Sequence, residues 1–335
     1  MTSAQHRRLG KDGPLVHPIG IGAMSFSDFY GTATEEGSHA ILSAAIDHGV
    51  NHLDTANIYG MGRSEETIGR FLKQQGSRAQ DFFTIASKGG ITRGNPDRPF
   101  NNSREHLNEE LDKTLTKLGV ECIDLYYIHR RDQSMPLEEV VDVLKDMIKA
   151  GKIKSFGFSE IAPTTIRAIA EMHPVAAVQS EYSLSNRGPE LGVVRATKEV
   201  GAAMVAFSPV GRGLLTDKPP TPEKAASLDF MKVNPRFMEP NLSANIKAVA
   251  PFQALAKEMG VATSSLAIAW LMHQDEHILP IPGTRSVDHL KELIAGAELN
   301  LSDSDLAAID AILPEGWAHG DRYSVAQWNG VERYC

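Results

Sequence analysis

The sequence predicts an α/β fold, a closed (β/α)8 or TIM barrel that forms a single domain over residues 1–335. Two observations support this prediction. Short apolar segments alternate with amphipathic helical segments along the whole chain, with a repeat of roughly 25–45 residues. About eight such units fill the chain, which favours a closed barrel of parallel strands with right-handed crossovers over an open, doubly wound sheet.

The predicted strands are short, apolar through their length and often β-branched, as expected for strands that are covered on both faces. They are Ile19–Met24, Val50–Asp54, Phe83–Ser87, Ile123–Ile128, Ser155–Ser159, Ala176–Gln179, Ala203–Ser208 and His277–Ile281. Before the first of them, the segment Arg8–Val16 contains an Asp12-Gly13 turn signal. It predicts a β-hairpin that plugs the bottom of the barrel.

End signals mark the helices between the strands. Thr34 with its following glutamates begins one helix, and Gly49 ends it. Ser64 is expected to begin the next helix, and Pro136 begins a later one. The sequence Ser302–Asp305 predicts a capping box on a late helix.

Two stretches lie outside the repeat. Residues Gly211–Asn245 are proline-rich and follow the seventh strand, and they are too long for an ordinary connection, which suggests a functional lid. The tail after Pro314 is rich in aromatic residues and is expected to lie over the mouth of the barrel. These aromatic residues are Trp317, Tyr323, Trp328 and Tyr334.

The composition is that of an ordinary enzyme, with 42% hydrophobic and 23% charged residues and a net charge of −8. This balance argues against a nucleic-acid or anionic-membrane surface, which needs a basic face. Cys122 and Cys335 give neither a disulfide framework nor a zinc-binding spacing. No segment resembles a signal peptide or a membrane span, so we expect a cytoplasmic protein, and a monomer because no apolar seam is visible.

Polar residues follow three consecutive predicted strands, at the point where a barrel places its active site. Asp54 ends the second strand and Tyr59 lies in its loop, whereas Lys88 and His129 end the next two strands. Each residue alone has a structural explanation, such as capping, packing or ion pairing. Because the three strand ends meet at one mouth, we interpret the four residues as a single catalytic site.

The four side chains suit the reduction of a carbonyl group. A free tyrosine has a pKa near ~10 and is a weak acid at neutral pH. A neighbouring ammonium lowers that pKa, and a carboxylate keeps the ammonium charged and in place. A histidine can orient a carbonyl oxygen by a hydrogen bond. The set therefore favours a phenolic acid that protonates a developing alkoxide, as hydride transfer to a carbonyl requires.

The segments Asp54–Gly60, Ala86–Lys88 and Tyr126–Arg130 closely resemble the tetrad motifs of the aldo-keto reductase family. The resemblance covers nearly the whole chain. It implies NADPH-dependent reduction of aldehydes and ketones to alcohols, with the 4-pro-R hydride transferred. It also implies Tyr59 as proton donor, Lys88 and Asp54 as its tuning pair, and His129 as the carbonyl-orienting residue. Within the family, the chain is most similar to broad-substrate members related to pyridoxal reductases and aryl-alcohol dehydrogenases.

The same resemblance implies the residues that bind NADPH. Ser159 and Gln179 would hold the nicotinamide carboxamide, and Phe207 would stack on the ring. The backbone that would wrap the pyrophosphate comprises Ser208, Pro209, Val210, Gly211, Arg212, Gly213 and Leu214. The residues that would bind the adenosine phosphates, and so favour NADPH over NADH, are Gly283, Thr284, Arg285 and His289. The chain has Glu160 and Leu293 where many members have asparagine.

Some residues near the predicted mouth keep two interpretations. The group Met24, Phe26, Phe29 and Tyr30 forms either an apolar substrate wall or packing beneath the lid. Arg130 and Arg131 either meet an acidic substrate or form structural ion pairs, of which we favour the ion pairs. No metal is expected, because Gly49 interrupts the helix that would align His48 with His52. The Gly20-Ile21-Gly22 sequence lacks the third glycine of a dinucleotide fingerprint.

Two other functions are compatible with parts of the sequence. A nicotinamide-binding regulatory subunit would keep the cofactor residues but show little turnover. A Schiff-base aldolase would use Lys88 as its nucleophile, but it would leave the Asp54–Tyr59 spacing and the phosphate segment at Gly283 without a purpose. Carbonyl reduction on a small-molecule substrate uses all of these features.

Overall fold

The computed structural model describes residues 5–92, 94 and 98–334. Its main sheet has eight parallel strands whose order in the sheet follows their order in the chain. They are β3 (Ile21–Gly22), β4 (His52–Asp54), β5 (Thr84–Gly89), β6 (Ile123–Ile128), β7 (Ile153–Ser159), β8 (Ala177–Glu181), β9 (Ala203–Phe207) and β10 (Ile278–Pro280). Each lies within or overlaps a predicted strand, so the predicted α/β architecture is confirmed.

Backbone hydrogen bonds join the two ends of this sheet. The Gly20 amide donates to the Pro280 carbonyl at 2.8 Å, and the Gly22 amide donates to the Pro282 carbonyl at 3.0 Å. A Cβ at Gly22 would lie 2.6 Å from the Ile281 carbonyl oxygen, so a glycine is required for this close approach. The sheet is therefore closed into a barrel.

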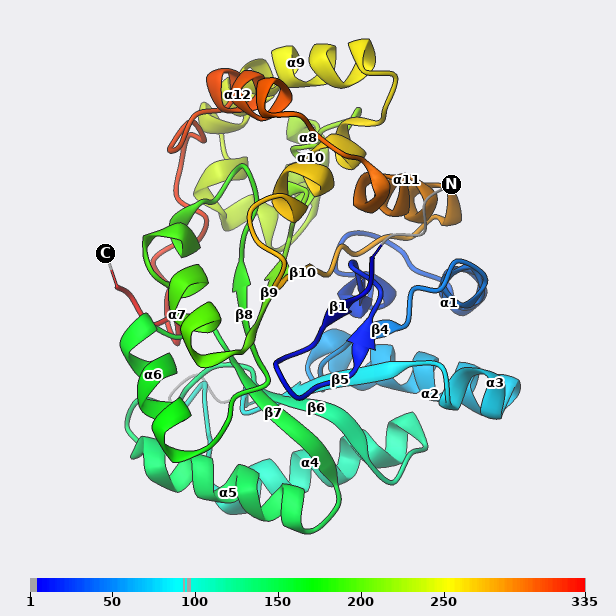
Figure 1. The fold of residues 1–335 in the computed structure, drawn as a ribbon, viewed down its shortest axis with the longest axis vertical. Coiled ribbons are helices and arrows are strands. Elements are labelled where there is room, and N and C mark those ends of the chain that lie inside the picture. The colour runs from blue at the N-terminus through cyan, green and yellow to red at the C-terminus, as the bar shows by residue number, and fades with distance from the viewer. Residues whose placement is uncertain (1–4, 93, 95–97, 335) are drawn as a thin grey trace.

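Helices surround the strands (Figure 1). Those that follow the first six strands are α1 (Glu35–Asp47), α2 (Arg63–Gln75), α3 (Ser77–Gln80), α4 (Arg104–Leu118), α5 (Leu137–Lys149), α6 (Pro163–Met172) and α7 (Val193–Val200). The later ones are α8 (Pro222–Ser227), α9 (Asn241–Glu258), α10 (Thr263–Met272), α11 (Val287–Glu298) and α12 (Asp303–Ile312). Helix α10 packs against β10 and α11, and α9 packs against α10 and α12. In the described part of the chain, no helix has the length and apolar character needed to cross a membrane.

Five of the twelve described α-helices, namely α1, α4, α8, α11 and α12, begin at a residue whose side chain caps the helix. The Thr34 hydroxyl accepts from the Gly37 amide at 3.1 Å, and the Ser302 capping box is present on α12. The prediction for Ser64 was wrong, because α2 begins at Arg63. The Ser64 hydroxyl is instead buried and contacts the Thr55 hydroxyl at 2.9 Å.

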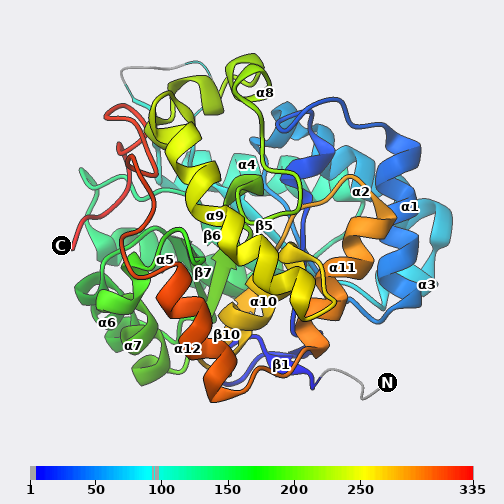
Figure 2. The same ribbon diagram turned by 90° about the horizontal axis from the view of Figure 1, so that it is seen from above.

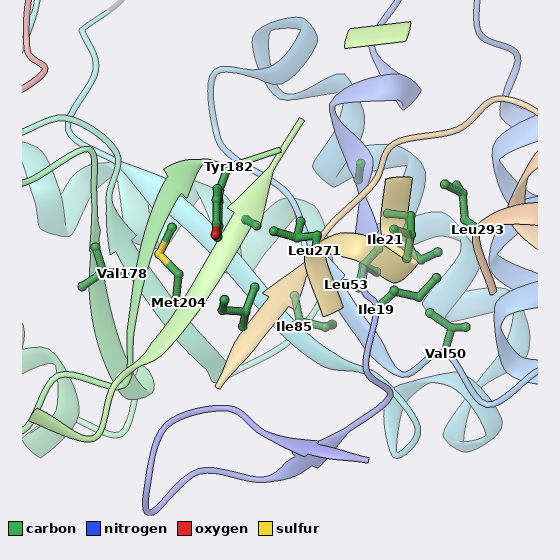
Figure 3. Close-up of a cluster of buried hydrophobic side chains, with 14 of the residues drawn as sticks. Ile19, Ile21, Val50, Leu53, Ile85, Val178, Tyr182, Met204, Leu271 and Leu293 are labelled. Carbon is green, nitrogen blue, oxygen red and sulfur yellow. The ribbon is translucent and has the colours of Figure 1, made fainter. Parts of the chain in front are cut away.

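Two layers of apolar side chains fill the molecule. Leu125 and Tyr127, two positions apart on β6, point into the barrel with residues from other strands. A second, larger layer lies between the strands and the helices (Figure 3). There Leu271 of α10 and Leu293 of α11 join the buried cluster that contains Leu53 and Ile85. Leu293 is 4% exposed and is a packing residue.

An antiparallel hairpin of β1 (Arg7–Arg8) and β2 (Leu15–Val16) closes one end of the barrel. Its Leu9 side chain, 2% exposed, belongs to the same cluster as the barrel interior. The Gly13 amide donates to the Gly10 carbonyl, so the turn centres on Lys11 and Asp12 rather than on Asp12 and Gly13 as expected. The expected plug is otherwise confirmed.

The predicted lid and tail lie at the opposite end of the barrel from the hairpin (Figure 2). The lid segment, residues 211–245, is not an irregular loop. It contains α8 and three 3-10 helices and has its own apolar cluster. The tail, residues 315–334, is bonded to the lid segment through Asn245. The Asn245 side-chain amide donates to the His319 carbonyl at 2.9 Å, and the His319 backbone amide donates to Asn245 Oδ1 at 2.7 Å.

Candidate active site

A buried ion pair lies at the carboxyl ends of β4 and β5. Asp54 is 1% exposed and Lys88 is 0% exposed. The Lys88 ammonium donates to Asp54 Oδ1 and, at 2.8 Å, to the Thr55 carbonyl. Gln179 of β8 donates to Asp54 Oδ2 at 2.8 Å. Buried charges are costly unless they are paired and hydrogen-bonded, and this arrangement satisfies both oxygens of the carboxylate.

Tyr59 is placed over this pair by a tight turn. Gly60, Met61 and Gly62, which follow it, all have left-handed backbone conformations, with φ values of 57°, 59° and 98°. A Cβ at Gly60 would lie 2.8 Å from the Ser27 Cβ, so the turn requires a glycine there. The turn directs the Tyr59 hydroxyl to within 3.4 Å of the Lys88 Nζ.

His129 completes the group from the end of β6. Its ring meets the Tyr59 ring edge-on, with centroids 5.8 Å apart. Its amide donates to the Gly89 carbonyl at 2.8 Å, which fixes the backbone next to Lys88. Its Nδ1 is buried and has no hydrogen-bond partner among the described residues. The structure thus brings all four predicted catalytic residues together.

The surroundings set the protonation of these groups. Burial raises the pKa of Tyr59 above its ordinary value, and the opposing effect of the Lys88 charge is smaller. Burial also lowers the pKa of His129 well below its ordinary value, with help from the charges of Arg130 and Lys88. Burial is the largest single influence on Lys88 and lowers its pKa, but the Asp54 carboxylate and the Tyr59 side chain together exceed it, so the pKa is raised.

The expected lowering of the Tyr59 pKa is therefore wrong in its net direction, because loss of hydration of the phenolate exceeds the effect of the Lys88 charge. A neutral phenol and a neutral imidazole next to an ammonium form a site that can donate a proton to an oxygen atom. The ammonium then stabilises the phenolate that remains.

A polar network behind the site was not predicted. Glu65 of α2 is fully buried, and its Oε1 accepts from Ser87 at 2.7 Å and from Thr114 of α4 at 2.8 Å. Ser87 directly precedes Lys88, so the network fixes the strand that positions the lysine. A signal was present, because Ser87 and Thr114 are polar residues on otherwise apolar faces.

The residues expected to hold the nicotinamide lie beside the catalytic group. Ser159 ends β7 and its hydroxyl accepts from Arg130 Nη1 at 3.0 Å, whereas Gln179 contacts Asp54. Phe207 ends β9 and is partly exposed. After it, Ser208, Gly211, Arg212 and Gly213 all have positive φ, between 51° and 97°. Such a turn can point successive amides at an anion.

The other expected phosphate residues surround the start of α11. Thr284 is buried and exchanges hydrogen bonds with the Ser286 backbone. Gly283, Arg285 and His289 are exposed. In the described part of the chain Arg285 forms no ion pair, and only the Thr32 carbonyl accepts from it, at 3.4 Å. A cation at a helix N-terminus suits a phosphate group, so these residues fit NADPH.

Glu160 does not face the site as a cofactor ligand would. Its carboxylate accepts two hydrogen bonds from Arg322 of the tail, at 3.1 and 2.5 Å, and one from the Glu181 amide at 2.9 Å. The Arg212 side chain likewise pairs with Glu181 at 3.1 Å. These two ion pairs, which anchor the tail and the lid segment, were not predicted. No local pattern in the sequence links residues that are so far apart.

The candidate substrate-wall residues divide into two groups. Phe26 is 1% exposed and lies in the main core. Met24, Phe29 and Tyr30 are partly exposed. Phe29 contacts Phe230 of the lid segment with ring centroids 5.5 Å apart, and the Tyr30 hydroxyl accepts from Arg212 at 3.2 Å. The structure thus places Phe29 and Tyr30 against the lid segment.

Comparison with known proteins agrees with this geometry. The model of the aldo/keto reductase family matches residues 18–314. The chain is 37% identical to aldo-keto reductase yakc, named with NADP(+), from Schizosaccharomyces pombe, over 95% of this chain and 94% of that protein. It is 36% identical to probable aldo-keto reductase 1 of Glycine max, over 100% and 95% of the two chains.

A solved structure is also similar to this fold. The glycerol dehydrogenase of Gluconobacter oxydans superimposes with a TM-score of 0.79 at 26% identity, covering 93% of this chain and 96% of that one. The family match spans the barrel and every strand that supports the catalytic group. The chain therefore belongs to the aldo/keto reductase family.

Proposed function

We propose that this protein reduces aldehydes and ketones to alcohols with NADPH, and that Tyr59 is the proton donor. The observation that supports this proposal is the contact of the Tyr59 hydroxyl with the Lys88 ammonium at 3.4 Å, with Asp54 bonded to the same ammonium. A phenol in this position is neutral before reaction, and its conjugate base is stabilised by the adjacent charge.

The roles of the side chains follow from their positions. When bound, the nicotinamide of NADPH would supply the hydride for the carbonyl carbon and would leave as NADP+. The carbonyl oxygen then gains negative charge, and the Tyr59 hydroxyl donates its proton to that oxygen. Neutral His129, with its ring beside that of Tyr59, orients the carbonyl oxygen. Lys88 stabilises the phenolate, and Asp54 with Gln179 holds Lys88 in place.

We infer that NADPH is preferred to NADH. Arg285 and His289 are exposed at the start of α11 and suit a 2′-phosphate, and a similar protein, yakc, carries NADP(+) in its name. Ser159 and Gln179 would hold the carboxamide, and the backbone after Phe207 would bind the pyrophosphate.

Replacement of one hydroxyl tests the proposal. Tyr59→Phe should lower the rate of aldehyde reduction by about 10²–10⁴-fold, the usual contribution of a general acid. The affinity of this variant for NADPH, and for NADH, should differ little from the wild-type affinity when each is measured by fluorescence titration. Tyr126→Phe is the matched control, because the Tyr126 hydroxyl is buried in the outer core without a partner among the described residues.

Two outcomes would contradict the proposal. If Tyr59→Phe reduces aldehydes at the wild-type rate, Tyr59 is not the proton donor. If the wild-type protein binds NADPH but reduces no member of a broad aldehyde and ketone panel, a regulatory nicotinamide-binding subunit is the better assignment.

A further inference from the structure

Arg236 lies near the mouth of the barrel and hydrogen-bonds the Gly320 carbonyl at 3.3 Å. Four other arginines also lie near the mouth, and three of these four are paired with buried carboxylates. Arg322 pairs with Glu160 at 2.5 Å, Arg212 pairs with Glu181 at 3.1 Å, and Arg131 pairs with Glu332 at 2.8 Å. All three glutamates are less than 9% exposed and each is neutralised. The fourth arginine is Arg130.

Arg130 takes only neutral partners. Its Nη1 donates to the His129 carbonyl at 2.6 Å and to the Ser159 hydroxyl at 3.0 Å. Within the described part of the chain, no carboxylate lies within ion-pairing distance of Arg130, and only its Nη1 has a protein acceptor. Its charge lowers the pKa of Glu160, but the hydrogen bonds of that carboxylate come from Arg322 and the Glu181 amide. The expected structural ion pair is therefore found for Arg131 but not for Arg130.

The position of Arg130 connects its charge with the reacting groups. It directly follows His129, and its hydrogen bond to Ser159 places the guanidinium between the ends of β6 and β7. Its charge favours the phenolate of Tyr59, disfavours protonation of His129 and reaches Tyr323 of the tail. The guanidinium is thus close to the place where a carbonyl substrate meets Tyr59.

A partly buried guanidinium with no carboxylate paired to it among the described residues favours an anion as its partner. Its planar fork of N–H donors matches a carboxylate, which can accept two parallel hydrogen bonds. A charged partner also compensates the cost of partly dehydrating the arginine. A neutral substrate would leave that cost uncompensated.

We propose that Arg130 selects aldehydes and ketones that carry a carboxylate, and holds that carboxylate while the carbonyl group faces Tyr59. This inference rests on the proposed function and assigns a substrate class to the same site. Arg130 is a specificity-determining residue in this assignment, whereas its neighbour Arg131, paired with Glu332, is structural.

Two substrates of similar shape, one neutral and one negatively charged, test the assignment. The nitro group of 4-nitrobenzaldehyde and the carboxylate of 4-carboxybenzaldehyde are both planar and similar in size, but only the carboxylate is charged. We expect Arg130→Gln to lower the ratio of kcat/KM for the carboxylate over kcat/KM for the nitro compound by about tenfold or more. In the control Arg131→Gln, this ratio should stay within about twofold of the wild-type value.

This ratio of kcat/KM values distinguishes the selection of a carboxylate by Arg130 from a general effect of the substitution on the site. If Arg130→Gln lowers kcat/KM equally for both aldehydes, the residue only supports His129 or Ser159, and the assignment is overturned. A larger loss with the nitro compound would overturn it as well.

Calorimetric titration keeps this test independent of turnover. The wild-type protein should bind 4-carboxybenzaldehyde more tightly than 4-nitrobenzaldehyde, and Arg130→Gln should remove that preference. If the wild-type protein reduces neither aldehyde, the proposed function fails, and the binding preference alone then decides the role of Arg130. Equal binding of the two aldehydes by wild-type protein would refute that role.

Discussion

The phenol of Tyr59 is subject to two opposing influences on its pKa. Burial favours the neutral form, because a phenolate loses hydration, and the Lys88 ammonium favours the phenolate. Burial is the larger effect, so the pKa lies above the ordinary value. Under the proposed function, the lysine acts mainly after the proton has left, when it stabilises the phenolate.

This balance predicts the ionisation of Tyr59 in the free protein. A raised pKa means that the group keeps its proton up to and beyond its ordinary value of 10.0. The difference in tyrosinate absorbance between the wild-type protein and Tyr59→Phe should therefore show no titration midpoint between about pH 7 and pH 10. A difference that titrates with a midpoint near pH 8 would show that Lys88 outweighs burial.

At the scale of elements, the tail is held by charge as well as by aromatic packing. Arg322 bonds Glu160, and its guanidinium lies 4.7 Å from the ring centroids of both Tyr323 and Trp328. Burial is the largest single influence on Glu160 and raises its pKa, but Arg322, with smaller contributions from Arg130 and the Glu181 amide, lowers the pKa below its ordinary value. The contribution of this pair to stability is therefore complete above the ordinary value of 4.5 and is lost as the pH falls through the lowered value.

Removal of the arginine should release the tail. Arg322→Gln leaves Glu160 buried without its cation, which costs about 3–5 kcal/mol when one partner of a buried pair is removed. We expect chymotrypsin to cleave after Tyr323 and Trp328 faster than in the wild-type protein, as followed by mass spectrometry. Arg333→Gln is the control, because Arg333 is exposed, lies 4.8 Å from the Trp328 ring centroid and forms no ion pair within the described part of the chain. Equal cleavage rates for both variants would exclude Arg322 as the anchor.

At the scale of the whole molecule, the hairpin contributes to stability through one of its two leucines. Leu9 is buried in the barrel interior, whereas Leu15 is 53% exposed. Leu9→Ala should lower the free energy of unfolding in urea by about 2–5 kcal/mol, because it leaves a cavity. Leu15→Ala should change it by less than about 0.5 kcal/mol. Similar losses in both variants would show that the hairpin does not plug the barrel.

The features that the sequence predicted correctly depend on local patterns. Strand and helix periodicity, and caps such as Thr34 and Ser302, involve residues that are close in the chain. The proximity of Asp54, Lys88 and His129 was also predictable, because parallel strand ends meet at one edge and these residues occupy three neighbouring strand ends. Their catalytic roles stay a prediction.

The features that could not be predicted join distant segments. The Glu160–Arg322 bonds connect residues 162 positions apart, and no periodic pattern records such a contact. Ser64 and Glu65 had the types expected at a helix start, but packing against β5 and α4 buried them in polar networks. The net pKa of Tyr59 likewise depends on its tertiary surroundings.

The seam between β3 and β10 limits when the barrel can be completed. Gly20 and Gly22 bond the backbone of Pro280 and Pro282, and Arg7 bonds carbonyls 265 to 271 positions away. When the chain is synthesised from its N-terminus, the edge of β3 that faces β10 therefore stays unpaired until almost the whole chain has been made. The short β3, with only two residues in the sheet, presents little edge to other chains during this wait.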